Sequence, residues 1–298
     1  MTINKNPVPG VWRLRSALVD GKPAFGAKPD GLLVLTPDGQ FAQAIISDTL
    51  PPYASGDRLD ATAEEYSAVV RATIGLYGVY ELNDDGTSTD HVIGATFPNW
   101  ANTLRHSDKL RRVVDGDVLS EFSVLGGETI ETVWHRAGDT APFNHPTSVV
   151  GTWRLEAAKA TVGDDVVLPF GNVPAGRLIF TSSGYFIDVL HRSDIPAFAS
   201  ASRSTGTTQE NTAAVQGSLI VFGQYSGDHQ GDFRDERVLG ASITNWTGMQ
   251  RNTTSLTETV SGDMLTEHLN DGDGVDIHLT FRTTATRARH RKSTLDSV

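Results

Sequence analysis

Titratable side chains in apolar strands are the first residues in this chain that could do chemistry. The run FIDVLHR, residues 186–192, carries Asp188 between Ile187 and Val189, followed by His191. A lone carboxylate in a buried strand has a raised pKa and needs a partner, which suits a general acid or base. Asp188 and His191 have opposite strand parity, so they face opposite sides unless a bulge intervenes. An outward position for Asp188 and a rim position for His191 are the structural alternatives.

Two other places combine histidine with a carboxylate. His91 follows Asp90 and starts an apolar face that includes Phe97, so it is either a proton-transfer group or a hydrogen-bonded core residue. Glu131 and His135 share strand parity. They would form an acid and imidazole pair inside a barrel if they face inward, and a weak rim pair if they face outward.

Tyrosine hydroxyls could donate a hydrogen bond to a carbonyl or enolate, and asparagine amides could do the same. We expect Arg234 and Glu236, in the run DHQGDFRDER, to belong to a solvated hairpin. The candidate catalytic residues are Asp188, His91, His191 and Tyr225; the candidate substrate-binding residues are Trp100, Asn99, Trp246, Asn245, Tyr80, Tyr185 and Phe97.

Composition and missing motifs exclude several classes of function. The chain has 298 residues, no cysteine and a formal charge of −11, which excludes thiolate chemistry and disfavours binding to nucleic acid. It contains no G-x-S-x-G, P-loop, G-x-G-x-x-G or H-E-x-x-H motif, and its nine histidines lack metal-ligand spacing. The run NDGDGVD, residues 270–276, lacks the acidic spacing of a calcium loop and is expected to be a hairpin turn. We therefore expect no cofactor and no metal.

The sequence contains two copies of one unit. GVWRL (residues 10–14) returns as GTWRL (151–155), and GATFPNW (94–100) returns as GASITNW (240–246). We expect domains at residues 7–138 and 147–287, a linker at 139–146 and a basic flexible tail at 288–298. Residues kept in both copies are most simply scaffold, so chemistry is expected where the copies differ.

Within each unit the pattern predicts β-strands and one helix. Short runs rich in Val, Ile, Leu, Phe and Tyr are separated by turn residues, which indicates an antiparallel barrel or a sandwich. The segments Thr62 to Glu65 and Thr207 to Glu210 are capping boxes, in which the threonine and glutamate satisfy amides at the start of a helix. Tyr66, Val69 and Val70 then recur on one helical face.

Several motifs of the first copy occur together in a fixed order: GVWRL, then G-x-L-x-x-T-x-D-G, PYAS before the capped helix, Y-G-x-Y and H-V-x-G-x-x-F-P-N-W. This set resembles the bacterial and fungal lipocalin-like domain proteins. The second copy departs from it at Arg237, Ile243 and Thr244, which stand where the first has His, Phe and Pro. The resemblance implies a calycin-type β-barrel with a cavity for an apolar small molecule. It implies no single reaction, because such barrels include binders, isomerases, cyclases and hydratases.

The expected architecture is all-β, with two tandem lipocalin-like antiparallel barrels that each carry one short capped helix. The leading functional hypothesis is a cofactor-independent enzyme, an isomerase, cyclase or hydratase of secondary metabolism that moves protons in a barrel cavity. The alternative is a non-catalytic binder or carrier of a lipophilic compound. The expected partner is an apolar small molecule, with nucleic acid and membrane excluded and a homodimer allowed. Because the N-terminus has no apolar leader, we expect a cytoplasmic protein.

Overall fold

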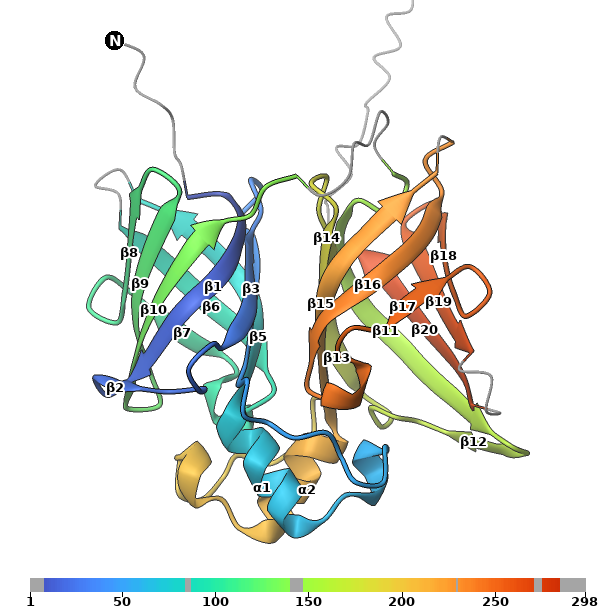
Figure 1. Cartoon of the computed structure of the whole chain (residues 1–298), viewed down its shortest axis with the longest axis horizontal. Coiled ribbons are helices and arrows are strands. Elements are labelled where there is room, and N and C mark those ends of the chain that lie inside the picture. Colours follow the sequence, from blue (N-terminus) through green and yellow to red (C-terminus); the bar gives the residue numbers. More distant parts are fainter. Residues whose placement is uncertain (1–7, 84–86, 140–146, 229, 271–274, 285–298) are drawn as a thin grey trace, which may run out of the picture.

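Two antiparallel β-barrels stand side by side, with two short helices beneath them (Figure 1). The computed structural model describes residues 8–83, 87–139, 147–228, 230–270 and 275–284. The barrels and their helices confirm the expected all-β fold. Most of the expected linker, the NDGDGVD turn and the basic tail lie outside the described residues, and the domain bounds stay a prediction. None of the described helices is long and apolar enough to cross a membrane.

Both barrels have the same strand order, which the repeated sequence predicts. In each barrel a single sheet curls round until its two edges meet. No backbone ladder joins these edges, and we call the place where they meet the seam. The seam lies between β6–β7 and β8 in the first barrel and between β16–β17 and β18 in the second. The first barrel contains β1 (Gly10–Val19), β2 (Lys22–Pro23), β3 (Asp30–Leu35), β4 (Gln40–Ile46), β5 (Thr73–Leu82), β6 (Ser88–Ala95), β7 (Thr103–Arg105), β8 (Leu110–Asp115), β9 (Val118–Leu125) and β10 (Glu128–Arg136). The second contains β11 (Gly151–Val162), β12 (Asp165–Val167), β13 (Pro174–Phe180), β14 (Tyr185–Arg192), β15 (Ser218–Gly227), β16 (Phe233–Ala241), β17 (Gln250–Asn252), β18 (Leu256–Ser261), β19 (Met264–Asn270) and β20 (Val275–Thr283).

The helices begin where the sequence predicts. α1 (Ala63–Ala72) and α2 (Thr208–Gln216) both start with a complete capping box, in which the glutamate also accepts a hydrogen bond from the preceding loop. These amide donors lower the pKa of Glu65 and Glu210. The two helices pack against each other (Figure 1). The four short 3₁₀ turns are η1 (Arg58–Asp60), η2 (Pro98–Trp100), η3 (Arg203–Thr205) and η4 (Thr244–Trp246).

Strands β4 and β14 are buried on both faces because one face lines a barrel and the other packs against the neighbouring barrel. The main hydrophobic core therefore runs through the interface and includes Ile45 of the first copy with Ile187 and Val189 of the second. This explains why FIDVLHR is apolar on both sides of Asp188, and it leaves Asp188 facing into the second barrel.

The repeated Asn-Trp pair holds the two copies together. Asn99 accepts a hydrogen bond from the backbone N–H of Phe198 at 2.7 Å and donates to the Phe198 carbonyl at 2.9 Å. Asn245 makes the same two bonds with Tyr53, at 2.9 and 3.2 Å. Because Tyr53 and Phe198 lie in the loop between the fourth barrel strand and the helix, each asparagine clamps the loop of the other copy. Figure 1 shows the result: each loop, with its 3₁₀ turn, passes beneath the opposite barrel.

Two equivalent arginines make further contacts between the two copies. Arg58, from the first copy, donates to the carbonyls of Val215 and Gln216 at the end of α2. Arg203, from the second copy, pairs with Glu128 at 3.0 Å and lies 4.9 Å from the ring centroid of Trp100. Both guanidinium groups are buried and satisfied by groups of the other copy, so the interface is specific as well as apolar.

Because each loop is held by the asparagine of the other copy, we expect both clamps to contribute to stability. Asn99→Ala and Asn245→Ala should each lower the free energy of unfolding by about 1–3 kcal/mol, because two backbone groups of the docked loop lose their partners. Urea unfolding followed by tryptophan fluorescence measures this, with Asn172→Ala as a control because that asparagine is exposed. Equal stability of Asn99→Ala and the control would contradict a clamping role.

Candidate functional site

The interior of the first barrel contains a network of charged side chains, which we call the arginine network: Asp90 on β6, Arg105 on β7, Arg112 on β8 and Glu121 on β9. Arg112 pairs with Asp90 at 2.7 Å and with Glu121 at 2.7 Å, while Arg105 pairs with Asp90 at 2.8 Å. Two positive charges thus balance two negative charges, and all four side chains are buried. Gln43 of β4 contacts Glu121 at 3.5 Å as a neutral neighbour.

This balance sets the protonation states and closes the first seam. Burial alone would raise the pKa of Asp90, but Arg112 and Arg105 outweigh it and hold that pKa below its usual value. Burial likewise opposes the charge on Arg112, yet Asp90 and Glu121 raise the pKa of its guanidinium. Because Arg112 lies on β8 and Asp90 on β6, their ion pair crosses the seam where no backbone ladder exists. The first barrel is therefore locked and electrically neutral inside.

The second barrel keeps the positions of this network but loses its charge balance. At equivalent places Glu236 stands for Asp90, Arg251 for Arg105, Glu258 for Arg112, Glu267 for Glu121, and Asp188 for Gln43. We call Asp188, Glu236, Glu258 and Glu267 the acidic cluster. Four carboxyl groups now face one guanidinium, whose ion pair with Glu236, at 2.8 Å, stays on one side of the seam. Among the described residues no ion pair crosses the second seam.

The acidic cluster is short of hydrogen-bond donors. One carboxyl oxygen of Asp188 (Oδ1) and one of Glu258 (Oε2) are buried without any partner. Glu258 and Glu267 hydrogen-bond to each other, which requires a proton on one of the two carboxyl groups. A buried acceptor without a donor is costly, so the site favours a proton or a cation at this place.

Burial dominates the electrostatics of the acidic cluster. It raises the pKa of Glu236 to about 7 even though Arg251 opposes the change. Burial, followed by the nearby charges of Glu267 and Glu236, raises the pKa of Asp188 well above its usual value. The pKa values of Glu258 and Glu267 are raised by the same desolvation. Glu236 therefore exchanges its proton near neutral pH, whereas the pKa of the equivalent Asp90 is lowered.

One acid of the second barrel is more exposed than its counterpart in the first. Glu267 is partly exposed, whereas the equivalent Glu121 is buried. The side chain of Arg251 is 11% exposed and lies 4.8 Å from the ring centroid of Trp246, which is itself only partly buried. Trp246 and Arg251 therefore lie beside the second seam, which no ion pair crosses among the described residues.

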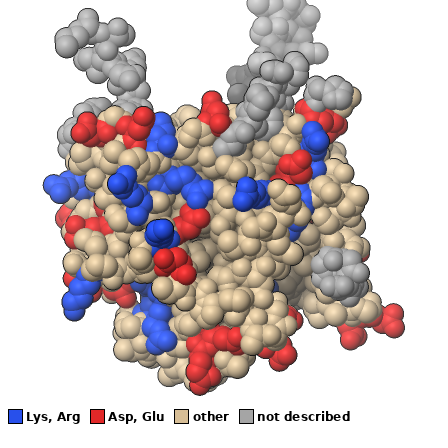
Figure 2. Space-filling view, in the orientation of Figure 1, with Lys and Arg blue, Asp and Glu red and all other residues tan. Residues whose placement is uncertain are grey.

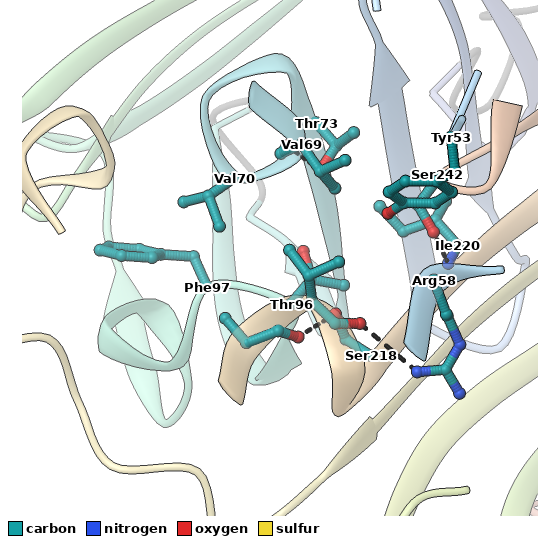
Figure 3. Close-up of a pocket in the computed structure, with 12 residues that line it drawn as sticks. Tyr53, Arg58, Val69, Val70, Thr73, Thr96, Phe97, Ser218, Ile220 and Ser242 are labelled. Atoms are coloured by element: carbon teal, nitrogen blue, oxygen red, sulfur yellow. Dashed lines mark hydrogen bonds between the residues drawn. The ribbon is translucent and has the colours of Figure 1, made fainter. Parts of the chain in front are cut away.

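Two other hollow places lie between the barrels. A cavity of about 20 Å³ beside the helices is lined by Tyr53, Arg58 and Phe97 (Figure 3), and it has room for a water molecule but not for a substrate. A larger cleft of about 550 Å³ lies between equivalent turns of the two copies, and its titratable groups, Asp38, Arg136 and Asp139, are not buried. On the outer surface in Figure 2 acidic and basic side chains are interspersed. The buried charge that lacks a matching counter-charge is inside the second barrel.

The structure separates the predicted histidines from Asp188. His191 faces out of the second barrel, as its parity predicts, and its Nε2 lies 3.1 Å from the hydroxyl of Tyr77 in the first barrel. Its Nδ1 donates to the Arg192 carbonyl, so Nε2 accepts from Tyr77. Burial lowers the pKa of His191, which keeps the ring neutral in this interface. His91 lies on the outer face of β6 and is half-buried, while its neighbour Asp90 points inward.

The predicted tyrosines have structural partners. Tyr80 donates to the Thr36 carbonyl at 2.6 Å and Tyr225 makes the equivalent bond to Thr181 at 2.6 Å. Burial raises the pKa of both phenols to about 12. Tyr185 is buried and accepts a long hydrogen bond from Gln224, at 3.5 Å.

The other predicted binding residues lie at the junction of the copies. Asn99 and Asn245 form the clamps, Phe97 packs edge-on against Phe198 at 4.9 Å between ring centroids, and Trp100 is buried beneath Arg203. Trp246 is the exception, because it lies beside the Arg251 of the second barrel. Whether any of these residues contacts a ligand stays a prediction.

The expectation for Glu236 is wrong. It was placed in a solvated hairpin, but it lies on β16 with its carboxyl group inside the barrel and only 4% of the residue exposed. Its neighbour Arg234 is exposed as expected. Glu131 and His135 face outward, so the rim alternative holds for them, and His135 contacts Arg15. Sequence reasoning also missed Arg251, Glu258 and Glu267; the exchange of Arg112 for Glu258 between the copies was the available signal.

Comparison with known proteins agrees with the paired barrels. The family described as lipocalin-like domain matches residues 9–129 and again residues 150–282. The chain belongs to the lipocalin-like domain family. A lipocalin-like barrel is consistent with the binding of a small molecule, and this membership says nothing of a reaction. Among curated proteins none matches the chain.

Solved structures give only remote similarities. A protein of unknown function from the DUF3598 family of Nostoc punctiforme is 10% identical, with 93% of this chain and 96% of that one covered and a TM-score of 0.22. Transferrin binding protein B of Neisseria meningitidis is 6% identical, with 86% of this chain and 52% of that one covered and a TM-score of 0.16. Scores this low carry no argument about function.

The acidic cluster predicts an unusual dependence of stability on pH. In the unfolded chain these carboxyl groups titrate near pH 4, whereas in the folded chain their pKa values are raised. The folded state then binds more protons above about pH 4, so stability falls as pH rises. Glu236 alone, with its pKa of about 7, would contribute a loss of roughly 3 kcal/mol between pH 4 and 8. Urea midpoints at pH 6 and pH 8 test this; a higher midpoint at pH 8 would contradict it.

Exchanging the residues that differ between the barrels should change stability in opposite directions. At pH 8, Glu258→Arg should stabilise the protein because it leaves three carboxyl groups with two guanidinium groups, which is closer to the two and two of the first barrel than four with one. Arg112→Glu should destabilise it by about 3–5 kcal/mol because it leaves buried carboxylates without a counter-charge. Glu81→Arg makes the same charge change at an exposed position and serves as the control. The same stability change in Glu258→Arg and Glu81→Arg would refute the importance of the interior balance.

Proposed function

We propose that the second barrel is the working barrel and that it binds a small molecule with an apolar body and a positively charged group. The acidic cluster would surround that group at the place where the first barrel holds the Arg112 guanidinium. The observation that carries the proposal is the replacement of a neutral network by four carboxyl groups around one arginine, with two buried carboxyl oxygens unpartnered. Membership of the lipocalin-like domain family supports a small-molecule ligand.

The surroundings of the acidic cluster fit such a ligand. Buried apolar side chains of the second core, among them Val238, Leu256, Leu265 and Phe281, lie on the same strands as the acids or next to them. An aliphatic or aromatic body would pack against these side chains while its cationic head replaces the missing counter-charge. Trp246 and Arg251, at the second seam, would also contact the ligand.

A second candidate function is acid–base catalysis in the same barrel, as an isomerase, cyclase or hydratase. The specific observation in its favour is the raised pKa of Asp188, which favours the protonated form of this buried carboxyl group, the form that can donate a proton. His91, His191 and Tyr225 lie on outer faces or are engaged in structural hydrogen bonds, so Asp188 is the residue on which this candidate depends.

Binding can be tested with matched probes of one chain length. Octylamine should bind the full-length protein and raise its melting temperature, while octanol and octanoate should bind at least tenfold more weakly, because only the amine supplies a positive charge. Glu258→Arg should abolish octylamine binding, and Glu81→Arg should leave it unchanged. Equal binding of all three probes, or unchanged octylamine binding by Glu258→Arg, would refute the proposal; isothermal titration calorimetry gives both answers.

The catalytic candidate is separated from simple binding by Asp188→Asn, which keeps the shape and neutral charge of the protonated side chain but cannot transfer a proton. Compounds that co-purify from the native host with the wild type and with Asp188→Asn can be compared by mass spectrometry after denaturation. Accumulation of a chemically distinct precursor only in Asp188→Asn supports an enzyme. The same unchanged compound in both proteins supports a carrier and contradicts catalysis by Asp188.

A further inference from the structure

A compact group of metal-ligating side chains lies on the outer face of the second barrel. His268 on β19 and His278 on β20 are directly opposite each other in the antiparallel ladder. Asp276 lies two residues before His278, on the same face of the strand. The three side chains therefore meet above one small patch of the sheet, on the side away from the acidic cluster.

The geometry brings all three potential ligands to one point. One oxygen of Asp276 lies 2.5 Å from Nε2 of His268 and 3.4 Å from Nε2 of His278. The two imidazole rings are stacked, with centroids 4.2 Å apart and an interplanar angle of 6°. The ligating atoms of the three residues all lie within 4.8 Å of one another. Bonds of about 2.0–2.2 Å from one metal ion to each ligand place the ligand atoms within about 4.4 Å of one another, which is close to the separation found here.

A structural role alone accounts poorly for this arrangement. The side chains are 39–50% exposed, and an exposed ion pair contributes little to stability. Two imidazoles stacked this closely would repel each other if both were protonated. The first barrel has Phe122, Thr129 and Glu131 at the equivalent positions, so the barrel scaffold does not require the group. Lys159 faces His278 from β11 as the adjacent exposed cation, and its flexible chain can turn into solvent.

We propose that His268, Asp276 and His278 form a surface binding site for a transition-metal ion of the zinc type. Two imidazoles and one carboxylate favour Zn²⁺, Co²⁺, Ni²⁺ or Cu²⁺ over Ca²⁺ and Mg²⁺, which prefer oxygen ligands. Three protein ligands leave a coordination position for water or for a further donor. A bound ion would also fasten β19 to β20, the strands that carry Glu267 and Phe281 on their inner faces.

The test uses the full-length protein without a histidine tag. Titration with Zn²⁺ should show one site per chain, Co²⁺ should give a visible absorption spectrum, and Zn²⁺ should raise the melting temperature, since an ion that binds only the folded state stabilises it. Mg²⁺ should do none of this. His268→Ala and His278→Ala should each weaken Zn²⁺ binding about tenfold or more, and Asp276→Asn should weaken it less.

His135→Ala is the matched control, because His135 lies on the corresponding closing strand of the first barrel. Its affinity for Zn²⁺ should equal that of the wild type. Retention of full Zn²⁺ affinity by both His268→Ala and His278→Ala would overturn the proposal, as would equal loss in His135→Ala. Circular dichroism of each variant shows whether its fold is intact, and all three substitutions are at partly exposed positions. The acidic cluster is unchanged in these proteins, so the outcome is independent of the proposed ligand.

Discussion

A carboxylate inside a β-barrel must have a counter-charge or a proton, and the rest of this structure depends on how each barrel meets that requirement. The first barrel uses Arg105 and Arg112, which neutralise its acids and join the two edges of its sheet. The second barrel has a glutamate in place of the second arginine and relies on protons instead. The exchange of Arg112 for Glu258, together with that of Gln43 for Asp188, changes the charge of the interior and removes the ion pair that crosses the seam.

The asparagine clamps that join the barrels are the same in both copies, while the charged residues inside the barrels differ. Asn99 and Asn245 are both retained because each clamps the opposite loop, so neither copy can lose its asparagine without loosening the other. No such coupling constrains the interiors. This separation lets the first copy serve as a rigid support while the second carries unsatisfied groups that a supporting barrel would not tolerate.

The paired barrels and their capped helices could be predicted from the sequence. Turn residues and capping boxes are local signals, and each occurs in both copies of the repeat. Asp188 could be singled out because it interrupts an apolar run on a strand that the interface buries on both faces. Glu236, Glu258 and Glu267 could not, because β16, β18 and β19 alternate polar residues with apolar ones and resemble strands with a solvated outer face. Only pairing across the barrel shows that these polar faces point inward.

The exchanged loops have a consequence for how such a chain could arise. A single unit would carry a docking loop and an asparagine clamp that fit each other only between two molecules, which are the two halves of a self-complementary, two-fold interface. The tandem chain therefore has the arrangement of a two-fold symmetric dimer within one polypeptide. Once the subunits are covalently joined, a substitution can enter one of them alone, and asymmetric specialisation such as that of the second barrel becomes accessible to a fold that began with two identical halves.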